Sequence, residues 1–409
     1  MILFYNISIR LYIFLIRVAS LFNEKARQWV QGRRDIFKRI EAAVQEGDRI
    51  AWFHAASLGE FEQGRPVIEA MREQTPDLKI LLTFFSPSGF EIRKDYEGAD
   101  YVFYLPADTR RNARKFLDLV QPEVVFFIKY EFWHHYLKGL RKRNIPTYLF
   151  SSIFRENQTF FKFYGGFYRK MLLAFSHLFV QTEKSAELLK SIGLTNVSVA
   201  GDTRFDRVFT IAHQAKVLPL AEKFKQNQPL LIAGSTWPKD EENLLSYINS
   251  SKEERKYIIA PHEVDEDHIQ RILEGLDKKV VRYTQANEEN VVDAEVLVVD
   301  CIGVLSSMYR YGEVAYIGGG FGKGIHNTLE AATFGMPIIF GPNYYKFQEA
   351  KDLIQLKGAF SYTQTKDLHQ LLDSFWQDAS TLKNAGKAAR SYVESQRGAT
   401  HKILKEALR

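Results

Sequence analysis

The chain has almost no cysteine. Cys301 is the only cysteine among 409 residues, so an internal disulfide is impossible and the sequence fits a reducing compartment. Hydrophobic residues make up 45% of the chain and charged residues 25%, which is typical of a globular protein and excludes an extended disordered one. A chain of this length can bury the cores of two or three domains.

The signatures of several enzyme classes are also missing. The glycines of Gly318–Gly324 fit neither G-x-G-x-x-G nor G-x-x-x-x-G-K-[ST], so the dinucleotide fingerprint and the P-loop are both excluded. No G-x-S-x-G nucleophile elbow occurs. The histidines lack metal-ligand spacing: two are adjacent and the others are scattered. The sequence therefore predicts neither a metal nor a cofactor.

The charge balance is basic, with a net charge of +6 and a pI near 9.0. Such a protein is attracted to anionic membranes, phosphorylated substrates or nucleic acid, and the charge alone does not choose among them. The basic residues are not concentrated in one helix or in a recognised nucleic-acid motif, so nucleic acid is not the expected partner.

The N-terminal segment 1–22 is the most apolar stretch. It lacks the order of a cleavable signal peptide, which begins with positive charge and ends with small residues. Arg10 and Arg17 are seven residues apart and share one helical face, which favours a helix in the membrane interface or a short anchor. A buried first helix is the alternative. Basic residues follow closely and favour a cytoplasmic location for what comes next: Lys25, Arg27, Arg33, Arg34, Lys38 and Arg39. Whether the segment crosses the bilayer or lies on it stays open.

From Arg49 to Thr203, continuous apolar runs alternate with amphipathic stretches such as Thr109–Val120 and Thr182–Ile192. Continuous runs are typical of buried parallel strands, so this half predicts a doubly wound α/β sheet. The predicted strands are Ile50–His54, Ile80–Phe85, Tyr101–Leu105, Val124–Ile128, Thr147–Phe150, His177–Gln181 and Val197–Ala200.

Two carboxylates follow strands of this sheet. Glu60 comes after the first strand and Glu131 after the fourth, and ligands of doubly wound sheets bind where strands end. One carboxylate could act as a general base while the other positions it. The alternative for Glu60 is a helix-start glutamate favoured by the helix dipole.

A mixed, charged linker, Arg204–Gln228, precedes a second series of strands. These are predicted at Leu230–Ala233, Tyr257–Ala260, Val280–Arg282, Val296–Val299, Val314–Ile317 and Ile338–Phe340. We expect a membrane-associated segment at 1–22 and two Rossmann-like lobes at 23–206 and 207–409. This pattern matches the two-lobed B-type (GT-B) glycosyltransferase architecture, which holds the nucleotide on the second lobe and the acceptor on the first.

The stretch Glu313–Gly335 reads as a strand, a glycine-rich loop and a helix that opens near Asn327. Glycines let the backbone approach a ligand closely, and a helix N-terminus attracts anions. Asn327 and Glu330 would share a helical face, with Glu330 placed for a sugar hydroxyl. The alternative is an ordinary strand–turn–helix connection. The predicted phosphate loop consists of Gly319, Gly320, Gly322 and Gly324.

A series of short motifs, in order over nearly the whole chain, carries a family likeness. They are H-A-A-S-L-G-E ending at Glu60, Y-L-P-A-D ending at Asp108, E-F-W beginning at Glu131, G-D-T-R-F-D beginning at Gly201, G-S-T beginning at Gly234, G-I-H-N-T-L-E beginning at Gly324 and G-P-N beginning at Gly341. Together they resemble the 3-deoxy-D-manno-octulosonic acid (Kdo) transferases of lipopolysaccharide assembly.

The resemblance implies an inverting transfer of Kdo from CMP-Kdo to a lipid A precursor, lipid IVA, at the inner membrane. It implies that Glu60 is the catalytic base and that Glu131 also takes part. The residues that it implies for CMP are Pro261 and His262, the turn Gly303, Val304 and Leu305, and the segment Asn327, Thr328, Leu329 and Glu330. The sequence departs from the family pattern at four places. Trp237 replaces a histidine, Tyr130 replaces a threonine and Thr328 replaces a proline. Pro261-His262-Glu263 stands where Pro-Arg-His-Pro is common, so the arginine of that motif is missing here.

Three other functions stay open on the sequence. They are a GT-B transferase or sugar epimerase that uses a UDP-sugar, a non-catalytic membrane-attached nucleotide-binding protein, and a basic nucleic-acid-binding protein. The sequence does not determine the number of Kdo units transferred, the acylation of the acceptor or the oligomeric state.

Overall fold

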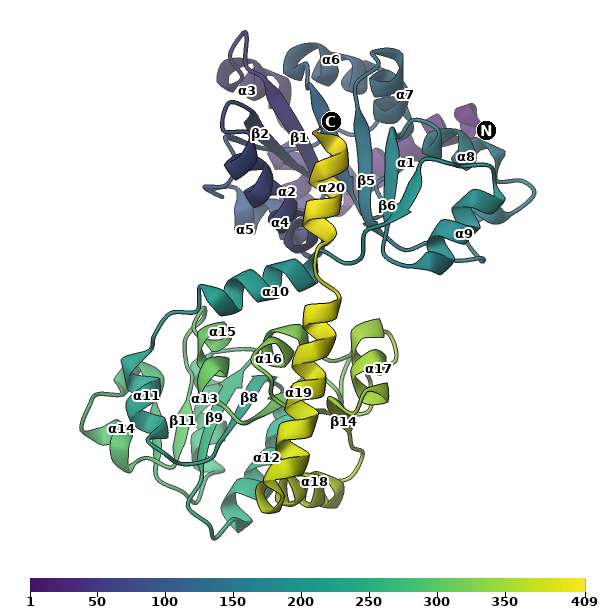
Figure 1. The fold of residues 1–409 in the computed structure, drawn as a ribbon. Helices are drawn as coiled ribbons and strands as arrows, with labels where there is room; N and C mark the ends of the chain where they lie inside the picture. The colour runs from purple at the N-terminus through teal and green to yellow at the C-terminus, as the bar shows by residue number, and fades with distance from the viewer. Residues whose placement is uncertain (409) are drawn as a thin grey trace. The chain divides into compact units, whose positions relative to one another are not determined.

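In the computed structural model, which describes residues 1–408, the chain forms two compact units (Figure 1). The first unit comprises Met1–Arg207 together with the segment that begins at Arg397, and the second comprises Val208–Gln396. Each unit is built on a seven-stranded parallel sheet, as the continuous apolar runs predict.

The first sheet has the strand order β3-β2-β1-β4-β5-β6-β7. The chain reverses its direction of winding between β1 and β4, so the topological switch point lies at the carboxyl ends of these two strands. All seven strands predicted for this half are present. They are β1 Ile50–Ala55, β2 Lys79–Phe84, β3 Tyr101–Tyr104, β4 Val124–Ile128, β5 Thr147–Ser152, β6 His177–Val180 and β7 Val197–Val199.

Helices cover both faces of the first sheet because its strands bury both sets of side chains. Trp52 and Phe127 pack with α3, α6, α7, α8 and α9 on one face, whereas Phe53 and Phe126 pack with α4 and α20 on the other. The helices of this unit are α1 Ile2–Ala19, α2 Glu24–Gly32, α3 Ile36–Ala43, α4 Leu58–Gln74, α5 Pro87–Arg93, α6 Arg110–Val120, α7 His134–Lys142, α8 Gly166–Leu172, α9 Glu183–Ser191 and α20 Ala399–Ala407, with the 3-10 turn η1 Thr159–Phe161.

The C-terminal helix α20 belongs to the first unit, which corrects the expected lobe boundary at 207–409. Ile403 and Leu404 are buried in the core on the α4 side of the first sheet. The carboxylate of Asp206 accepts hydrogen bonds from the backbone amides of Gly398 and Thr400, each at 2.7 Å. An apolar face and a capped start thus dock the last helix on the first sheet.

The second sheet has the strand order β10-β11-β9-β8-β12-β13-β14, with its switch point between β8 and β12. All six predicted strands are present, and β14, a three-residue strand at the sheet edge, was not predicted. The strands are β8 Leu230–Thr236, β9 Lys256–Pro261, β10 Val280–Arg282, β11 Val296–Val298, β12 Val314–Ile317, β13 Ile338–Phe340 and β14 Ala359–Ser361.

One face of the second sheet packs with α12, α13 and α18 around Tyr257 and Tyr316. The helices of this part of the chain are α10 Arg204–His213, α11 Pro219–Lys225, α12 Pro238–Ser250, α13 Glu266–Glu274, α14 Asn290–Asp293, α15 Leu305–Met308, α16 Leu329–Thr333, α17 Gln348–Gln355, α18 Thr365–Gln377 and α19 Ala379–Ser395, with the 3-10 turns η2 Tyr283–Gln285 and η3 Tyr309–Tyr311.

Candidate functional site

Glu60 lies in the first turn of α4, directly after β1. Ser57 occupies the N-cap position, and its hydroxyl donates a hydrogen bond to the Glu60 carboxylate. The start of a helix is a favourable place for negative charge, and the carboxylate is half-buried rather than enclosed. Glu60 is therefore held at the switch point of the first sheet with access to a substrate.

Glu131 follows β4 and is held more tightly than Glu60. It is 8% exposed, and its Oε2 accepts hydrogen bonds from Trp133 Nε1 at 2.7 Å and from His54 Nε2 at 3.0 Å. His54 is fully buried at the end of β1, and its Nδ1 lies 2.9 Å from Thr83 Oγ1. These bonds tie together the ends of the adjacent strands β1 and β4. The geometry suits a carboxylate that positions its surroundings.

In the second unit, two segments expected to hold the nucleotide meet at Glu330. Ser306, which follows the turn Gly303–Leu305, donates a hydrogen bond from Oγ to Glu330 Oε2 at 2.6 Å. Asn327 Nδ2 donates to the other carboxylate oxygen at 2.9 Å. Two donors thus fix the orientation of a half-buried carboxylate, whose remaining lone pairs can accept hydrogen bonds from hydroxyl groups.

The helix expected near Asn327 begins at Leu329 and is only five residues long. Asn327 precedes it and accepts a hydrogen bond from the Leu329 amide at its own Oδ1, at 3.1 Å. Both the nitrogen and the oxygen of the Asn327 side-chain amide are thus hydrogen-bonded within the protein. A helix of five residues also has only a weak dipole. The buried hydroxyl of Thr328 has no hydrogen-bond partner among residues 1–408.

The glycine-rich loop after β12 is less open than the sequence suggests. The amide of Gly319 donates to Asp240 Oδ2 at 2.8 Å, and the amide of Gly322 donates to Gly319 O at 3.0 Å. These two amides are satisfied within the protein, so the expectation that they cradle a phosphate is wrong. Gly320 and Gly324 are the members of the predicted phosphate loop that remain candidates.

Close backbone packing explains why glycine is needed in this loop. A Cβ atom on Gly318 would lie 2.1 Å from Ser235 O, and one on Gly320 would lie 2.5 Å from Gly341 N. The loop therefore packs against the end of β8 and against the segment that follows β13. A side chain at either glycine would force the backbone segments apart.

Asp240, which sequence reasoning missed, anchors this region. It is fully buried and accepts hydrogen bonds from the amides of Gly319 and Trp237 and from the Tyr316 hydroxyl, at 2.8, 3.0 and 2.8 Å. Burial raises the pKa of its carboxyl group. The signal in the sequence is Pro238-Lys-Asp240 after a strand, since proline at the first helical position and a carboxylate in the first turn mark a helix start.

Trp237, His262 and His326 form an aromatic stack where β8, β9 and β12 end. The two histidine rings are 4.3 Å apart between centroids, and Trp237 is 4.9 Å from His262. Trp237 Nε1 donates a hydrogen bond to His326 Nε2 at 2.9 Å. Burial lowers the pKa of His326 to about 4, so the ring is neutral at pH 7 and carries its proton on Nδ1. His326 is thus a fixed N–H donor.

Helix α1 is the one helix among residues 1–408 that is long and apolar enough to cross a membrane, judged by length and composition. It packs against the first unit near its own N-terminus, where the Tyr5 hydroxyl donates to Asp108 and His135 Nε2 donates to Asn6 Oδ1 at 2.7 Å. Burial raises the pKa of Asp108 to about 6 and lowers that of His135 to about 4. Farther along, the Tyr12 ring stacks on Phe85 at 5.9 Å.

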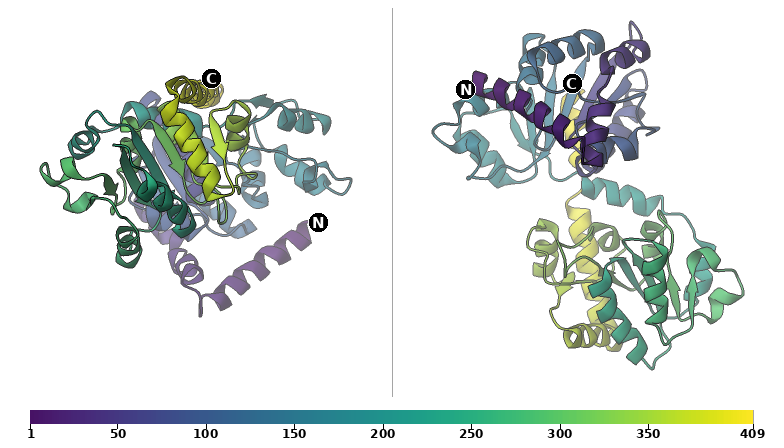
Figure 2. Two further views of the ribbon diagram at one scale, coloured as in Figure 1. Left: turned by 90° about the horizontal axis from the view of Figure 1, so that it is seen from below. Right: turned by 180° about the vertical axis from the view of Figure 1, so that it is seen from behind.

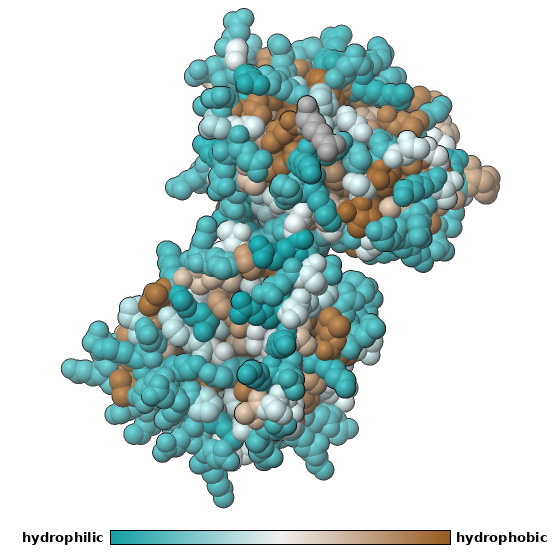
Figure 3. Space-filling model, viewed as in Figure 1, coloured by the Kyte–Doolittle hydropathy of each residue, from teal (hydrophilic) through white to brown (hydrophobic). Residues whose placement is uncertain are grey.

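The other side of α1 is apolar and exposed. Figure 2 (right) shows α1 lying across the outside of the first unit. Figure 3, viewed from the side away from α1, shows apolar residues scattered among hydrophilic ones. The exposed apolar side chains of residues 1–22 are Met1, Ile2, Leu3, Phe4, Ile7, Leu11, Tyr12, Phe14, Leu15, Val18, Leu21 and Phe22.

Known proteins share both the sequence pattern and the fold. Residues 31–207 match the family model described as 3-deoxy-D-manno-octulosonic-acid transferase (kdotransferase). The chain is 27% identical over 377 residues to the 3-deoxy-D-manno-octulosonic acid transferase of Rickettsia bellii, covering 89% of this chain and 88% of that one. It is 24% identical over 403 residues to the enzyme of that name from Haemophilus influenzae, covering 95% and 93%.

Among solved structures, the UDP-GlcNAc 2-epimerase of Neisseria meningitidis is similar with a TM-score of 0.59 and 12% identity, over 88% of this chain and 99% of that one. At this identity the likeness concerns the fold alone, which is the two-lobed GT-B fold. The family model and the relatives, which are matched over most of their length, show that this chain is similar to the 3-deoxy-D-manno-octulosonic acid (Kdo) transferases.

Proposed function

We propose that this protein transfers Kdo from CMP-Kdo to the lipid A precursor lipid IVA in lipopolysaccharide core biosynthesis and releases CMP. The similarity to Kdo transferases supports the choice of Kdo as the sugar that is transferred. The main observation in support of the proposed roles is that Ser306 and Asn327 both donate hydrogen bonds to Glu330. These bonds bring together the two chain segments that the family resemblance assigns to the nucleotide.

In this proposal the second unit holds the donor. Glu330 accepts hydrogen bonds from the ribose hydroxyls, and the turn Gly303–Leu305 lies against the nucleoside. His326 and His262 offer N–H donors to the phosphate, and Gly320 and Gly324 allow the backbone to approach it. Donors that are fixed before the reaction stabilise the negative charge that the phosphate gains as CMP leaves. Trp237 positions His326 by holding its Nε2 as an acceptor.

The first unit supplies the base. A hydroxyl of the acceptor disaccharide attacks the anomeric carbon of Kdo, and Glu60 takes its proton as the new C–O bond forms. The bond from the anomeric carbon to the CMP phosphate oxygen breaks on the opposite face, so the configuration inverts in one displacement. Glu131, fixed by His54 and Trp133, keeps the ends of β1 and β4 in place.

At the membrane, α1 lies in the interface of the inner membrane, with the two units on the cytoplasmic side. Its contacts through Tyr5, Asn6 and Tyr12 hold one face on the protein, which leaves the opposite apolar face for lipid. A groove in the first unit beside α1 is lined by basic residues suited to a phosphorylated acceptor or lipid headgroup. They are Arg17, Arg33, Arg34, Lys38 and Lys115.

The activity is tested by mass spectrometry of the lipid formed from purified protein, CMP-Kdo and the tetra-acylated precursor. We expect a lipid heavier by one or more Kdo units, which also counts the units transferred. UDP-sugars offered in parallel test the alternative donor that the shared fold allows. A product from a UDP-sugar but none from CMP-Kdo would overturn the proposal.

The placement of α1 is tested with a cysteine introduced at Ile2 in a Cys301→Ser background. In intact cells, a membrane-impermeant maleimide should leave Ile2→Cys unlabelled if α1 lies on the cytoplasmic side. Labelling from outside the inner membrane would instead show that α1 spans it.

A further inference from the structure

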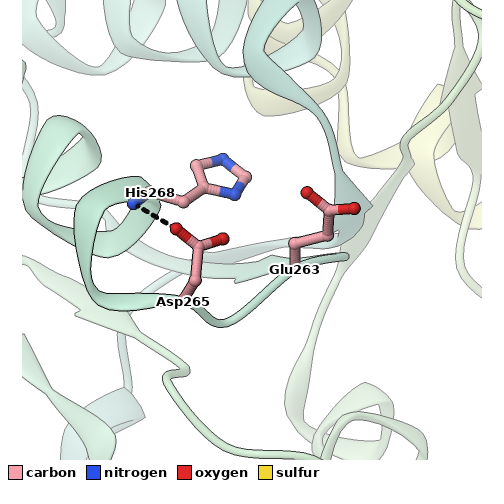
Figure 4. A group of neighbouring side chains, drawn as sticks. All are labelled: Glu263, Asp265 and His268. Carbon is pink, nitrogen blue, oxygen red and sulfur yellow. Dashed lines mark hydrogen bonds between the residues drawn. The ribbon is translucent and has the colours of Figure 1, made fainter.

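Three metal-ligating side chains meet where β9 ends and α13 begins (Figure 4). They are Glu263, Asp265 and His268, and one possible ligand atom from each lies within 4.8 Å of the other two. The sequence predicted no metal, because its histidines lack metal-ligand spacing and no carboxylate pair of metal-binding type accompanies the glycine-rich loop. Here the pattern is E-x-D-x-x-H, in which a single histidine joins two carboxylates.

His268 is oriented as a metal-binding histidine would be. It is 2% exposed, and its Nε2 donates a hydrogen bond to the carboxylate of Glu241 at 2.8 Å. Glu241 is itself buried and also accepts a hydrogen bond from Thr236 Oγ1 at 2.8 Å. With the proton on Nε2, the lone pair of Nδ1 is left for a ligand, and Figure 4 shows the ring directed toward the two carboxylates. Histidines that bind metals commonly donate their other N–H to a carboxylate in this way.

Each of the two carboxylates has at least one oxygen that could bind a metal ion. Asp265 caps α13 by accepting a hydrogen bond from the His268 amide at its Oδ1, at 3.0 Å, which leaves Oδ2. Glu263 has no hydrogen-bond or ion-pair partner in the described chain, and no hydrogen bond joins either carboxylate to the imidazole ring of His268. Two carboxylates at this separation repel each other, and a cation bound between them would offset the repulsion.

We propose that Glu263, Asp265 and His268 bind one divalent zinc ion. One imidazole nitrogen and two carboxylate oxygens form a ligand set that suits zinc, whereas magnesium and calcium prefer oxygen ligands alone. The ion clamps the turn between β9 and α13, and that turn begins at His262. The binding of the ion does not depend on the proposed transferase function, because its ligands are separate from the residues assigned to the donor.

The experiment measures zinc binding by the purified full-length protein after removal of metals with a chelator. Zinc chloride is titrated in competition with a chromogenic zinc indicator, and the bound metal is counted by elemental analysis. We expect one zinc ion per chain. The variants Glu263→Gln and Asp265→Asn should each bind zinc at least about tenfold more weakly, since each removes one of three protein ligands.

Asp267→Asn is the matched control, because Asp267 is an exposed acid in the same first turn of α13 and its carboxylate makes no hydrogen bond or ion pair in the described chain. It should bind zinc like the parent protein. His268→Gln, which keeps a polar group beside Glu241, should abolish binding while thermal melting shows a folded protein. No stoichiometric zinc in the parent protein, or an equal loss of affinity in Asp267→Asn and Asp265→Asn, would overturn the proposal.

Discussion

The two units share a topology but carry opposite chemistry at the same place in it. Each has a seven-stranded parallel sheet with a switch point beside its first strand. In the first unit this point carries two carboxylates, Glu60 and Glu131. In the second it carries the stack of Trp237, His262 and His326. Strand order therefore fixes where a ligand binds, and the loop residues decide which chemistry is available there.

The two switch points are also held in place differently. Side chains hold the carboxylates of the first unit, through Ser57, His54 and Trp133. In the second unit, glycine backbones pack together, and Asp240 anchors the loop. Substitutions in the first unit should thus change the rate of the reaction, and those in the second should change donor affinity.

Glu60→Gln should reduce kcat by about 10²–10⁴-fold, the usual contribution of a general base. The affinity for CMP should be unchanged, because Glu60 lies outside the unit assigned to the donor. Steady-state kinetics and calorimetry check the two quantities. Glu73→Gln, an exposed change near the end of the same helix, should have no effect on either. An unchanged kcat in Glu60→Gln would show that Glu60 is not the general base.

Glu330→Gln should weaken CMP binding by about 10- to 100-fold, because a hydrogen bond to a charged group is worth roughly 1.5–3 kcal/mol. Asn327→Ala should weaken it less, since it frees one oxygen of Glu330 without removing the charge. Calorimetry measures both constants, with the exposed Glu289→Gln as the control in the same unit. If both variants bound CMP as tightly as the parent protein, this segment would be an ordinary strand–turn–helix connection without a role in donor binding.

Glu131→Gln should lower the free energy of unfolding by about 1–3 kcal/mol, because the new amide sets one donor against the N–H groups of His54 and Trp133. Thermal melting measures the loss. The fall in kcat should be smaller than in Glu60→Gln, since Glu131 is proposed to act through its neighbours. A fall in kcat as large as that of Glu60→Gln, at unchanged stability, would reverse the roles of the two carboxylates.

Trp237→Phe should weaken CMP binding by about 2- to 10-fold, the effect of one neutral hydrogen bond worth about 0.5–1.5 kcal/mol. The variant keeps the ring but loses the N–H that fixes His326. The pKa of His326 should rise above its present value of about 4, because that bond stabilises the neutral form. Nitrogen NMR reads the tautomer and the pKa. Trp376→Phe is the control, because it removes an N–H that has no hydrogen-bond partner among residues 1–408.

The low pKa of His326 also predicts how the stability of the protein and its affinity for CMP depend on pH. The folded-state pKa of His326 lies below its ordinary value of 6.5, so the unfolded chain binds more protons between the two values. Its contribution to stability is therefore present above pH 6.5 and is lost as the pH falls toward 4. His326 should accordingly add no pH dependence to CMP affinity from about pH 6 to 8 in the parent protein, where it stays neutral. A rise in affinity as the pH falls through 6.5 would show a histidine that binds phosphate as a cation.

Patterns of burial predicted the fold well because most strands of both sheets are continuous apolar runs, as in β1, β4 and β9. The edge strand β14 was missed because Ala359–Ser361 is too short to form such a run. The docking of α20 was missed because an apolar face, here Ile403 and Leu404, does not specify which sheet it covers.

Within the candidate site, motifs located Glu60 and Glu330, whose neighbours in the sequence are distinctive. Asp240 and Ser306 were missed because their partners, Gly319 and Glu330, are far away in the chain. The glycine loop was misjudged for a related reason. A glycine can let the backbone approach a ligand, or it can let two backbone segments pack closely together. The sequence does not distinguish these two roles, because the neighbouring atoms are known only from the structure.

The separate roles of the two units are tested most directly by calorimetric titration of CMP into four full-length proteins: the parent, Glu60→Gln, Glu330→Gln and the double variant. We predict the same Kd for the parent and Glu60→Gln, and a raised Kd that is equal in Glu330→Gln and the double variant. A Kd raised as much by Glu60→Gln as by Glu330→Gln would contradict the assignment of the base to one unit and the donor to the other.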